Sequence, residues 1–170
     1  MSNIYLYRLN RLKAFLTFLH KNGIIDINRI DDDSDDGFIN RLKIQKCTYL
    51  ARFYGLDLGY EYDMYIYGPY SVKLAEDYYS IIRDFKENNN SSGNNNNNGI
   101  LEFKSNKFLT DIKSRTPEWL EVATTILDLY GIYGKNREKL IKHVSSIKTY
   151  ETDYINNVYE DLKEIGLIAD

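Results

Sequence analysis

The sequence predicts a mainly α fold, an α+β arrangement in which helices dominate and only one small β element is present. Apolar residues recur at helical spacing in six separate segments, whereas a single clear segment alternates with a period of two. At 170 residues the chain has the length of one ordinary domain and can bury a sizeable core without disulfide or metal support. We therefore expect residues 1–170 to form one compact helical domain.

Each expected helix combines an apolar stripe with a start or stop signal. Ser71 is a candidate N-cap, and Thr116 precedes Pro117, which suits the first position of a helix. Gly131 and Gly134 are expected to end the helix that starts there. The apolar stripes place helices at 3–21, 38–54, 74–85, 118–130, 140–147 and 154–165. In the second of these, apolar residues cover more than half of the circumference, so we expect it to be mostly enclosed.

The remaining segments are expected to be strands and loops. Residues 60–67 alternate as a strand would, and Gly68-Pro69 is expected to end this strand with a turn. Residues 100–104 are a second, shorter strand candidate. The Asn-rich segment 87–99 has no side chains suited to burial, so it is expected to be a flexible surface loop.

The composition excludes several classes of protein. Apolar residues are 43% and charged residues 28% of the chain, which excludes global disorder, and no apolar run approaches the ~20 residues of a membrane span. Because Cys47 is the only cysteine and no basic-then-apolar leader is visible, we expect a cytoplasmic protein with no membrane partner. The net charge of -3 opposes gross nucleic-acid binding, although residues 1–30 carry +4 and residues 100–150 carry +3.

The sequence contains no constellation typical of a metal site or a catalytic site. The acidic segment 31–36 has part of the oxygen spacing of a calcium loop, but Lys43 stands where the bidentate acid is needed. Asp35 or Asp36 is expected instead to cap the following helix. The only two histidines have no partner at metal-ligand spacing. We therefore expect no metal, no cofactor and no enzyme activity.

Lysines within an apolar helix and a cluster of tyrosines need an explanation. Lys46 falls on the apolar arc of its helix, with Lys43 close by, and a buried ammonium group must be paired or must reach solvent. One hypothesis is that the ammonium groups extend to the rim, towards Asp57, Glu61 or Asp63. The other is a ligand- or partner-binding role, including a lysine of depressed pKa that acts as a base or nucleophile. The six tyrosines within 54–70 either pack structurally or stack on a ligand.

Two short motifs in this region resemble a known family. Residues 43–50 resemble the K-[LI]-x-K-x-x-Y-[LF] helix of the Panacea, or SocA-like antitoxin, family and its YwgA-like relatives. The Tyr-Gly-Pro-Tyr-Ser run at 67–71, followed by Leu74, resembles the family's second signature, a strand that ends in Y-G-P before a helix. The resemblance spans residues 38–85 only, and many members have an aliphatic residue after Gly-Pro, where this chain has Tyr70.

The resemblance implies a compact, winged-helix-like helical domain that works by contacting another protein. Family members include antitoxins that neutralise a toxin and an adaptor for proteolysis, and no cofactor or catalytic residue accompanies the family. The expected partner is therefore a toxin-like or protease-related protein. The signature positions, with a structural or partner-binding role, are Lys43, Lys46, Tyr49, Tyr67, Gly68, Pro69, Tyr70 and Ser71.

The alternative hypothesis is a winged-helix-like DNA-binding transcriptional regulator. It depends on a basic stretch in the fourth quarter of the chain, which would contact phosphates and make binding steeply dependent on salt. The residues of this candidate nucleic-acid patch are Lys135, Arg137, Lys139 and Lys142. The hypothesis also draws on His143 beside them and on the basic first helix, with Arg8, Arg11 and Lys13.

Overall fold

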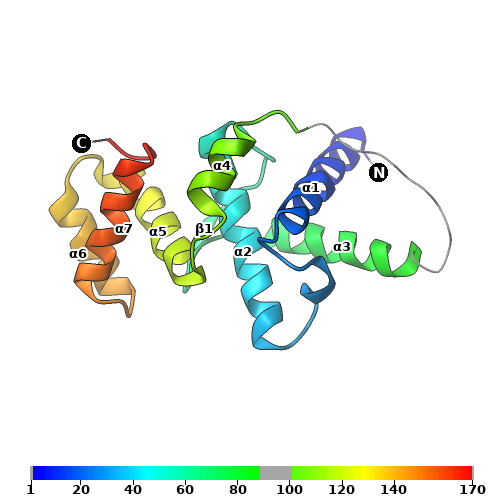
Figure 1. The fold of residues 1–170 in the computed structure, drawn as a ribbon, viewed down its shortest axis with the longest axis horizontal. Helices are drawn as coiled ribbons and strands as arrows, with labels where there is room; N and C mark the ends of the chain where they lie inside the picture. The colour runs from blue at the N-terminus through cyan, green and yellow to red at the C-terminus, as the bar shows by residue number, and fades with distance from the viewer. Residues whose placement is uncertain (1, 89–100, 170) are drawn as a thin grey trace.

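The fold is mainly helical, as predicted, with one small antiparallel sheet (Figure 1). It is seen in a computed structural model that describes residues 2–88 and 101–169. The α-helices are α1 (Asn3–Lys21), α2 (Asp35–Ala51), α3 (Val72–Asn88), α4 (Ser105–Ile112), α5 (Pro117–Tyr133), α6 (Arg137–Ile147) and α7 (Thr152–Glu164). The strands are β1 (Asp63–Tyr65) and β2 (Gly68–Tyr70), and the short 3-10 helices are Ile27–Arg29 and Arg52–Tyr54.

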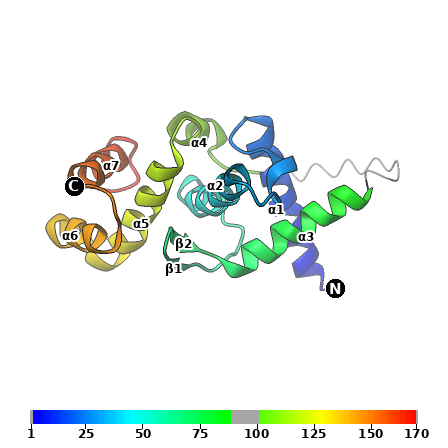
Figure 2. The same cartoon turned by 90° about the horizontal axis from the view of Figure 1, so that it is seen from below.

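Two enclosed helices hold the molecule together. Eleven residues of α2 and ten residues of α5 are buried, so neither helix presents a broad face to solvent. The prediction that the helix around 38–54 is mostly enclosed is therefore confirmed. Helix α5 contacts α2 and β2 on one side and both α6 and α7 on the other. It thus joins the hairpin region to the C-terminal helices (Figure 2).

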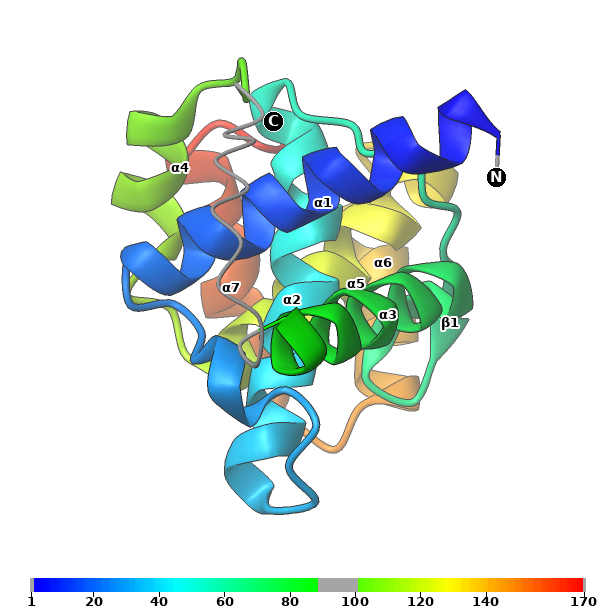
Figure 3. The same cartoon turned by 90° about the vertical axis from the view of Figure 1, so that its right-hand side faces the viewer.

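Helices α1 and α3 pack together at the end of the molecule opposite α6 and α7. Figure 3 shows them in front of α2. Between them, Asp77 of α3 is buried and accepts hydrogen bonds from Arg8 of α1 at 2.9 Å and from the Tyr60 hydroxyl at 2.8 Å. Lys73 also lies 3.3 Å from this carboxylate, so the buried charge is paired.

Only residues 63–65 of the strand predicted at 60–67 form a strand, and this strand is the first of a hairpin that continues to Tyr70. Asp63 pairs with Tyr70, and Tyr65 pairs with Gly68, so Ile66 and Tyr67 form the turn. The sequence analysis was wrong to place the turn at Gly68-Pro69, because these residues belong to the second strand. Gly68 has a φ of +87°, which a glycine adopts at little cost.

Side chains of α2 hydrogen-bond the outer edge of the hairpin, where a third strand would otherwise lie. Lys46 Nζ donates to the Pro69 carbonyl at 2.7 Å. Gln45 Nε2 donates to the Ser71 carbonyl, and the Ser71 N–H donates to Gln45 Oε1, both at 2.9 Å. A proline can occupy this short strand because its carbonyl, the one backbone polar group it has, is satisfied by a side chain.

Helix α4 was missed, and a strand was expected just before it. Residues 101–104 are irregular, and the Lys104 N–H donates to the Tyr54 carbonyl at 2.9 Å. The aromatic ring of Phe108 in α4 then packs edge-on against Phe15 of α1 and against Tyr54. With only eight residues, α4 offers too few apolar positions for a visible helical period, and this aromatic packing stabilises it.

Several boundaries differ from those expected. Ser34 caps α2, not Asp35 or Asp36, and its hydroxyl accepts from the Gly37 N–H at 3.3 Å. Gly131 lies inside α5, and Gly134 ends it. Helix α3 continues to Asn88, so residues 87 and 88 are helical and not part of a loop, and the rest of the loop predicted at 87–99 lies outside the described residues. Within 2–88 and 101–169, no helix has both the length and the apolar character that a lipid bilayer requires.

Candidate functional site

A pocket of about 190 Å³ opens between α2, the hairpin and α3. It is the candidate site because it brings together one lysine and two tyrosines of the predicted signature. The residues that line it are Phe38, Arg41, Leu42, Gln45, Lys46, Tyr67, Tyr70, Tyr78 and Tyr79. Of these described residues, five are aromatic, two are cationic and none is acidic.

Aromatic rings form the wall and rim of the pocket. Phe38, at the start of α2, meets Tyr67 of the hairpin turn edge to face, with 5.1 Å between ring centroids. Both rings are accessible, at 41% and 48% of their full exposure. On the α3 side, the ring centroids of Tyr78 and Tyr79 are 4.8 Å apart. Burial raises the pKa of Tyr78, so this phenol stays neutral at physiological pH.

Lys46 forms the floor of the pocket and is 2% exposed. Its hydrogen bond to the Pro69 carbonyl joins the two signature motifs directly. The expected reach of its ammonium group to the rim, towards Asp57, Glu61 or Asp63, is therefore wrong. Enclosure by α2, the hairpin and α5 prevents it.

A second buried lysine and one carboxylate lie behind Lys46. Lys148, in the connection between α6 and α7, is 2.8 Å from Glu121 Oε1, and Tyr150 donates to Glu121 Oε2 at 2.9 Å. Lys148 also donates to the carbonyl of Ile66 in the hairpin turn. The sequence analysis missed Glu121 and Lys148. One signal for Glu121 was available, since it is an acid on the most apolar helix of the chain.

The pKa of Lys46 is lowered to about 7. Burial is the main cause, the charge of Lys148 adds to it, and the charge of Glu121 partly opposes it. A lysine base or nucleophile needs such a pKa, but the ammonium group here is hydrogen-bonded and almost wholly covered. Because Lys46 lines the pocket, its nitrogen can be reached only by a group that enters the pocket, and the enzyme hypothesis requires this of a substrate.

The other signature residues do not gather at the pocket. Lys43 is half-buried on α2 and is not among the pocket residues. The Tyr49 hydroxyl donates to Asp128 of α5 at 3.1 Å, and the Arg52 guanidinium lies 4.2 Å from the centroid of its ring. Tyr49 thus fixes α2 against α5, which is a structural role.

Gly68 sets how closely the hairpin packs on α5. A Cβ atom added at this position would lie 2.7 Å from Thr125 Oγ1 and 3.3 Å from the Glu121 carbonyl. Cβ atoms in proteins almost never approach an oxygen as closely as the first of these distances, so no larger residue fits unless the hairpin or Thr125 moves. Ser71 completes the junction, because its hydroxyl accepts from the Leu74 N–H and caps α3, as predicted.

The hairpin also exposes an apolar surface beside the pocket. Its members are consecutive: Met64, Tyr65, Ile66 and Tyr67, and Ile66 is 81% exposed. We call residues 64–67 the hairpin tip. Exposed apolar residues that adjoin in this way differ from the single ones scattered on any surface, and they are typical of interaction sites.

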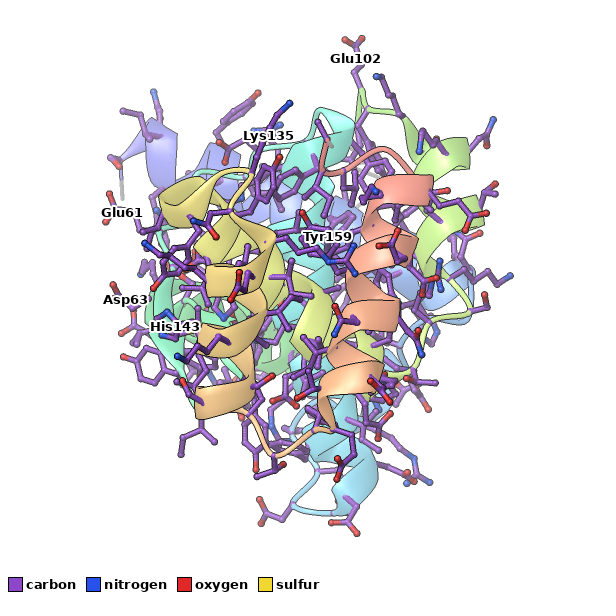
Figure 4. All side chains as sticks on the ribbon, turned by 90° about the vertical axis from the view of Figure 1, so that its left-hand side faces the viewer. Glu61, Asp63, Glu102, Lys135, His143 and Tyr159 are labelled. Carbon is purple, nitrogen blue, oxygen red and sulfur yellow. The ribbon has the colours of Figure 1, made fainter. Side chains whose placement is uncertain are left out.

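Three of the four residues of the candidate nucleic-acid patch are exposed, and the fourth forms an ion pair. Lys135, Lys139 and Lys142 are exposed, near or within the first two turns of α6. Arg137 is engaged, because it pairs with Glu160 of α7 and lies 4.6 Å from the ring centroid of Tyr159. Figure 4 shows the face that carries α6 and α7, with Lys135 at the upper end of that face.

Neither histidine nor the cysteine forms a reactive site. His143 is hydrogen-bonded to the Tyr133 hydroxyl at 2.8 Å, and His20 accepts from the Ile27 N–H at 3.1 Å. Cys47 is fully buried, and burial raises its pKa to about 12. Within the part of the chain that the structure describes, no three metal-ligating side chains cluster.

Comparisons of the chain with protein-family models, with curated proteins and with solved structures give no match.

Proposed function

We propose that the protein is a non-enzymatic protein-interaction module, antitoxin-like or adaptor-like, that contacts its partner with the hairpin tip. The observation that carries this proposal is the run of exposed apolar residues at 64–67, which adjoins an aromatic pocket. Burying such a surface against another protein removes apolar area from water, at a gain of roughly 25 cal/mol per Å².

The hairpin tip is held in place before any partner arrives. Lys148 donates a hydrogen bond to the Ile66 carbonyl in the turn, and Lys46 donates one to the Pro69 carbonyl. The Gln45 side chain hydrogen-bonds both the N–H and the carbonyl of Ser71. A surface that is already ordered loses little conformational entropy on binding, so more of the apolar gain remains as affinity. The anchoring residues Lys46 and Pro69 belong to the motifs that resemble the Panacea family, whose members contact toxins or proteases.

Site-specific photocrosslinking tests this proposal. A photoreactive phenylalanine replaces Ile66 at the hairpin tip, and in a matched control it replaces Ile132, which is 74% exposed at the end of α5. We expect one discrete protein adduct in native cells from position 66 and none from position 132. In a second experiment the photoreactive phenylalanine replaces Phe38. Ile66→Asp should abolish the protein adduct from position 38, and Ile132→Asp should not. Adducts that are equal at positions 66 and 132, or absent at 66, would refute the proposal.

A winged-helix-like DNA-binding regulator is the second candidate. The exposed Lys135, Lys139 and Lys142 favour it, because phosphate binding needs accessible cations. Against it, the hairpin that would serve as a wing begins with Asp63 and is preceded by Glu61, and Figure 4 shows both residues at the edge of the face that carries α6. If this candidate holds, duplex DNA binds at low salt and affinity falls steeply as salt rises. Absence of binding at low salt excludes it.

A further inference from the structure

The charges beneath the pocket do not balance. Two lysines, Lys46 and Lys148, are buried beside a single carboxylate, Glu121. Both oxygens of Glu121 are engaged, since one accepts a hydrogen bond from Lys148 and the other from Tyr150. The buried group of three thus carries one more positive charge than negative charge when both lysines are protonated. A buried charge without a counter-charge is costly, so this arrangement favours an anion nearby.

The unused hydrogen-bonding capacity lies on Lys46. An ammonium group has three N–H donors, and Lys46 uses one of them, towards Pro69. It has no other hydrogen-bond partner among the described residues. Lys46 lines the pocket although only 2% of its surface is exposed, so an anion receives these donors only if it enters the pocket fully.

Arg41 adds a second cation on the same helix. Its Nη1 donates to the carbonyls of Ile30 and Asp32, at 2.8 Å each, which fixes the guanidinium group against the loop before α2. Among the described residues its other nitrogen atoms make no hydrogen bond. The carboxylate of Asp32 feels the charge of Arg41, but it is exposed and hydrogen-bonds the Ser34 N–H. Arg41 therefore keeps donors for a ligand.

The walls of the pocket suit an apolar or aromatic group. Phe38 and Tyr67 offer accessible rings at the rim, and Tyr79 offers another on α3. Aromatic rings bind a further ring edge to face or offset, with a gain beyond the area that is buried. The volume of about 190 Å³ admits one large side chain and little more.

We propose that this pocket binds a carboxylate carried on an aromatic or apolar body, with the carboxylate received by Lys46 and Arg41 and the body packed against Phe38, Tyr67 and Tyr79. This inference rests on the proposed function and deepens it. It makes the pocket the specificity element of the interaction, and it makes a carboxylate-bearing residue of the partner the group that enters beside the hairpin tip.

A pair of isosteric probes tests the pocket without knowledge of the partner. Phenylacetate carries the charge, and phenylacetamide has the same shape without it. We expect phenylacetate to bind about tenfold more tightly by NMR titration at a pH about one unit below the pKa of Lys46, where this lysine is protonated, because a charge-assisted hydrogen bond is stronger than a neutral one by about this factor. Lys46→Met should remove the difference, whereas Lys43→Met, on the same helix but outside the pocket, should retain it. Equal affinities in the wild type, or an unchanged difference in Lys46→Met, would overturn the proposal.

Two further measurements separate the outcomes. Phe38→Ala alters only the accessible rim, so the fold is expected to persist, and both probes should bind more weakly. Phenylacetate in excess should reduce the crosslink from position 66 if a partner residue occupies the pocket. Binding without competition supports a free small carboxylate as the ligand. If neither probe binds and the position-66 crosslink remains, the pocket inference fails while the proposed function stands.

Discussion

Replacing Gly68 with alanine tests how the hairpin is joined to α5. Two independent costs are expected. The φ of +87° disfavours any residue with a Cβ, by about 1–2 kcal/mol. The added Cβ would also lie 2.7 Å from Thr125 Oγ1, so the hairpin must shift, and such overpacking costs about 1–3 kcal/mol.

Gly23→Ala is the matched control for the first of these costs. Its φ is +72°, but an added Cβ would meet no atom within 4 Å. Both substitutions also restrict the unfolded chain to the same extent, and that contribution cancels in the comparison. We therefore expect Gly23→Ala to cost about 1 kcal/mol and Gly68→Ala about 3 kcal/mol, which lowers Tm by roughly 6–12 °C for a chain of this size.

The assay is chemical denaturation followed by circular dichroism, with thermal unfolding as a second measure. The same protein samples serve for crosslinking from position 66, because a displaced hairpin should weaken that adduct in Gly68→Ala only. If Gly68→Ala is no more destabilising than Gly23→Ala, the hairpin does not pack on α5 as closely as described, and the explanation given for the Gly-Pro motif is refuted.

Three other predictions concern the groups around the pocket and the core. The pKa of Lys46 is lower in the folded chain, at about 7, than its ordinary value of 10.5, so the unfolded chain binds more protons between these values. The free energy of unfolding should therefore rise from about pH 7.5 to about pH 9.5, and Lys46→Met should flatten this rise in urea titrations; an equal slope in both proteins contradicts the assignment. Gln45→Leu should cost about 2 kcal/mol, because it leaves two buried backbone groups of Ser71 unpaired; a loss below about 0.5 kcal/mol would mean that water replaces the amide. Cys47 should react with iodoacetamide only after denaturation, and rapid labelling of the native protein would show that α2 opens readily.

The helices could be predicted where a segment has apolar residues at helical spacing and an N-cap residue of its own. Residues 3–21 match α1 in full, and Thr116 caps α5 as expected, with its hydroxyl accepting from the Trp119 N–H. Both features are local, since they need only residues three or four positions apart. Helix α4 and the hairpin escaped prediction because neither is stabilised locally. The first depends on rings from α1, and the second depends on side chains from α2 and on Lys148.

The candidate site could be predicted in part. The motifs pointed to Lys46, Tyr67 and Tyr70, which the structure brings to one pocket. The sequence could not supply Glu121 or the way in which Lys46 is enclosed, because these depend on a helix more than fifty residues further along the chain. Tyr49 shows the converse, since a conspicuous motif position proves to contact α5 and not the pocket.

Lys148 links the connection between α6 and α7 to the hairpin turn. It lies between α6 and α7, yet its ammonium group holds both Glu121 and the carbonyl of Ile66. The C-terminal helices therefore tether the hairpin turn, and the tip cannot lift from α5 while this lysine stays in place. A partner that pulls on Ile66 therefore also pulls on the α6–α7 connection, in addition to the packing of the hairpin on α5.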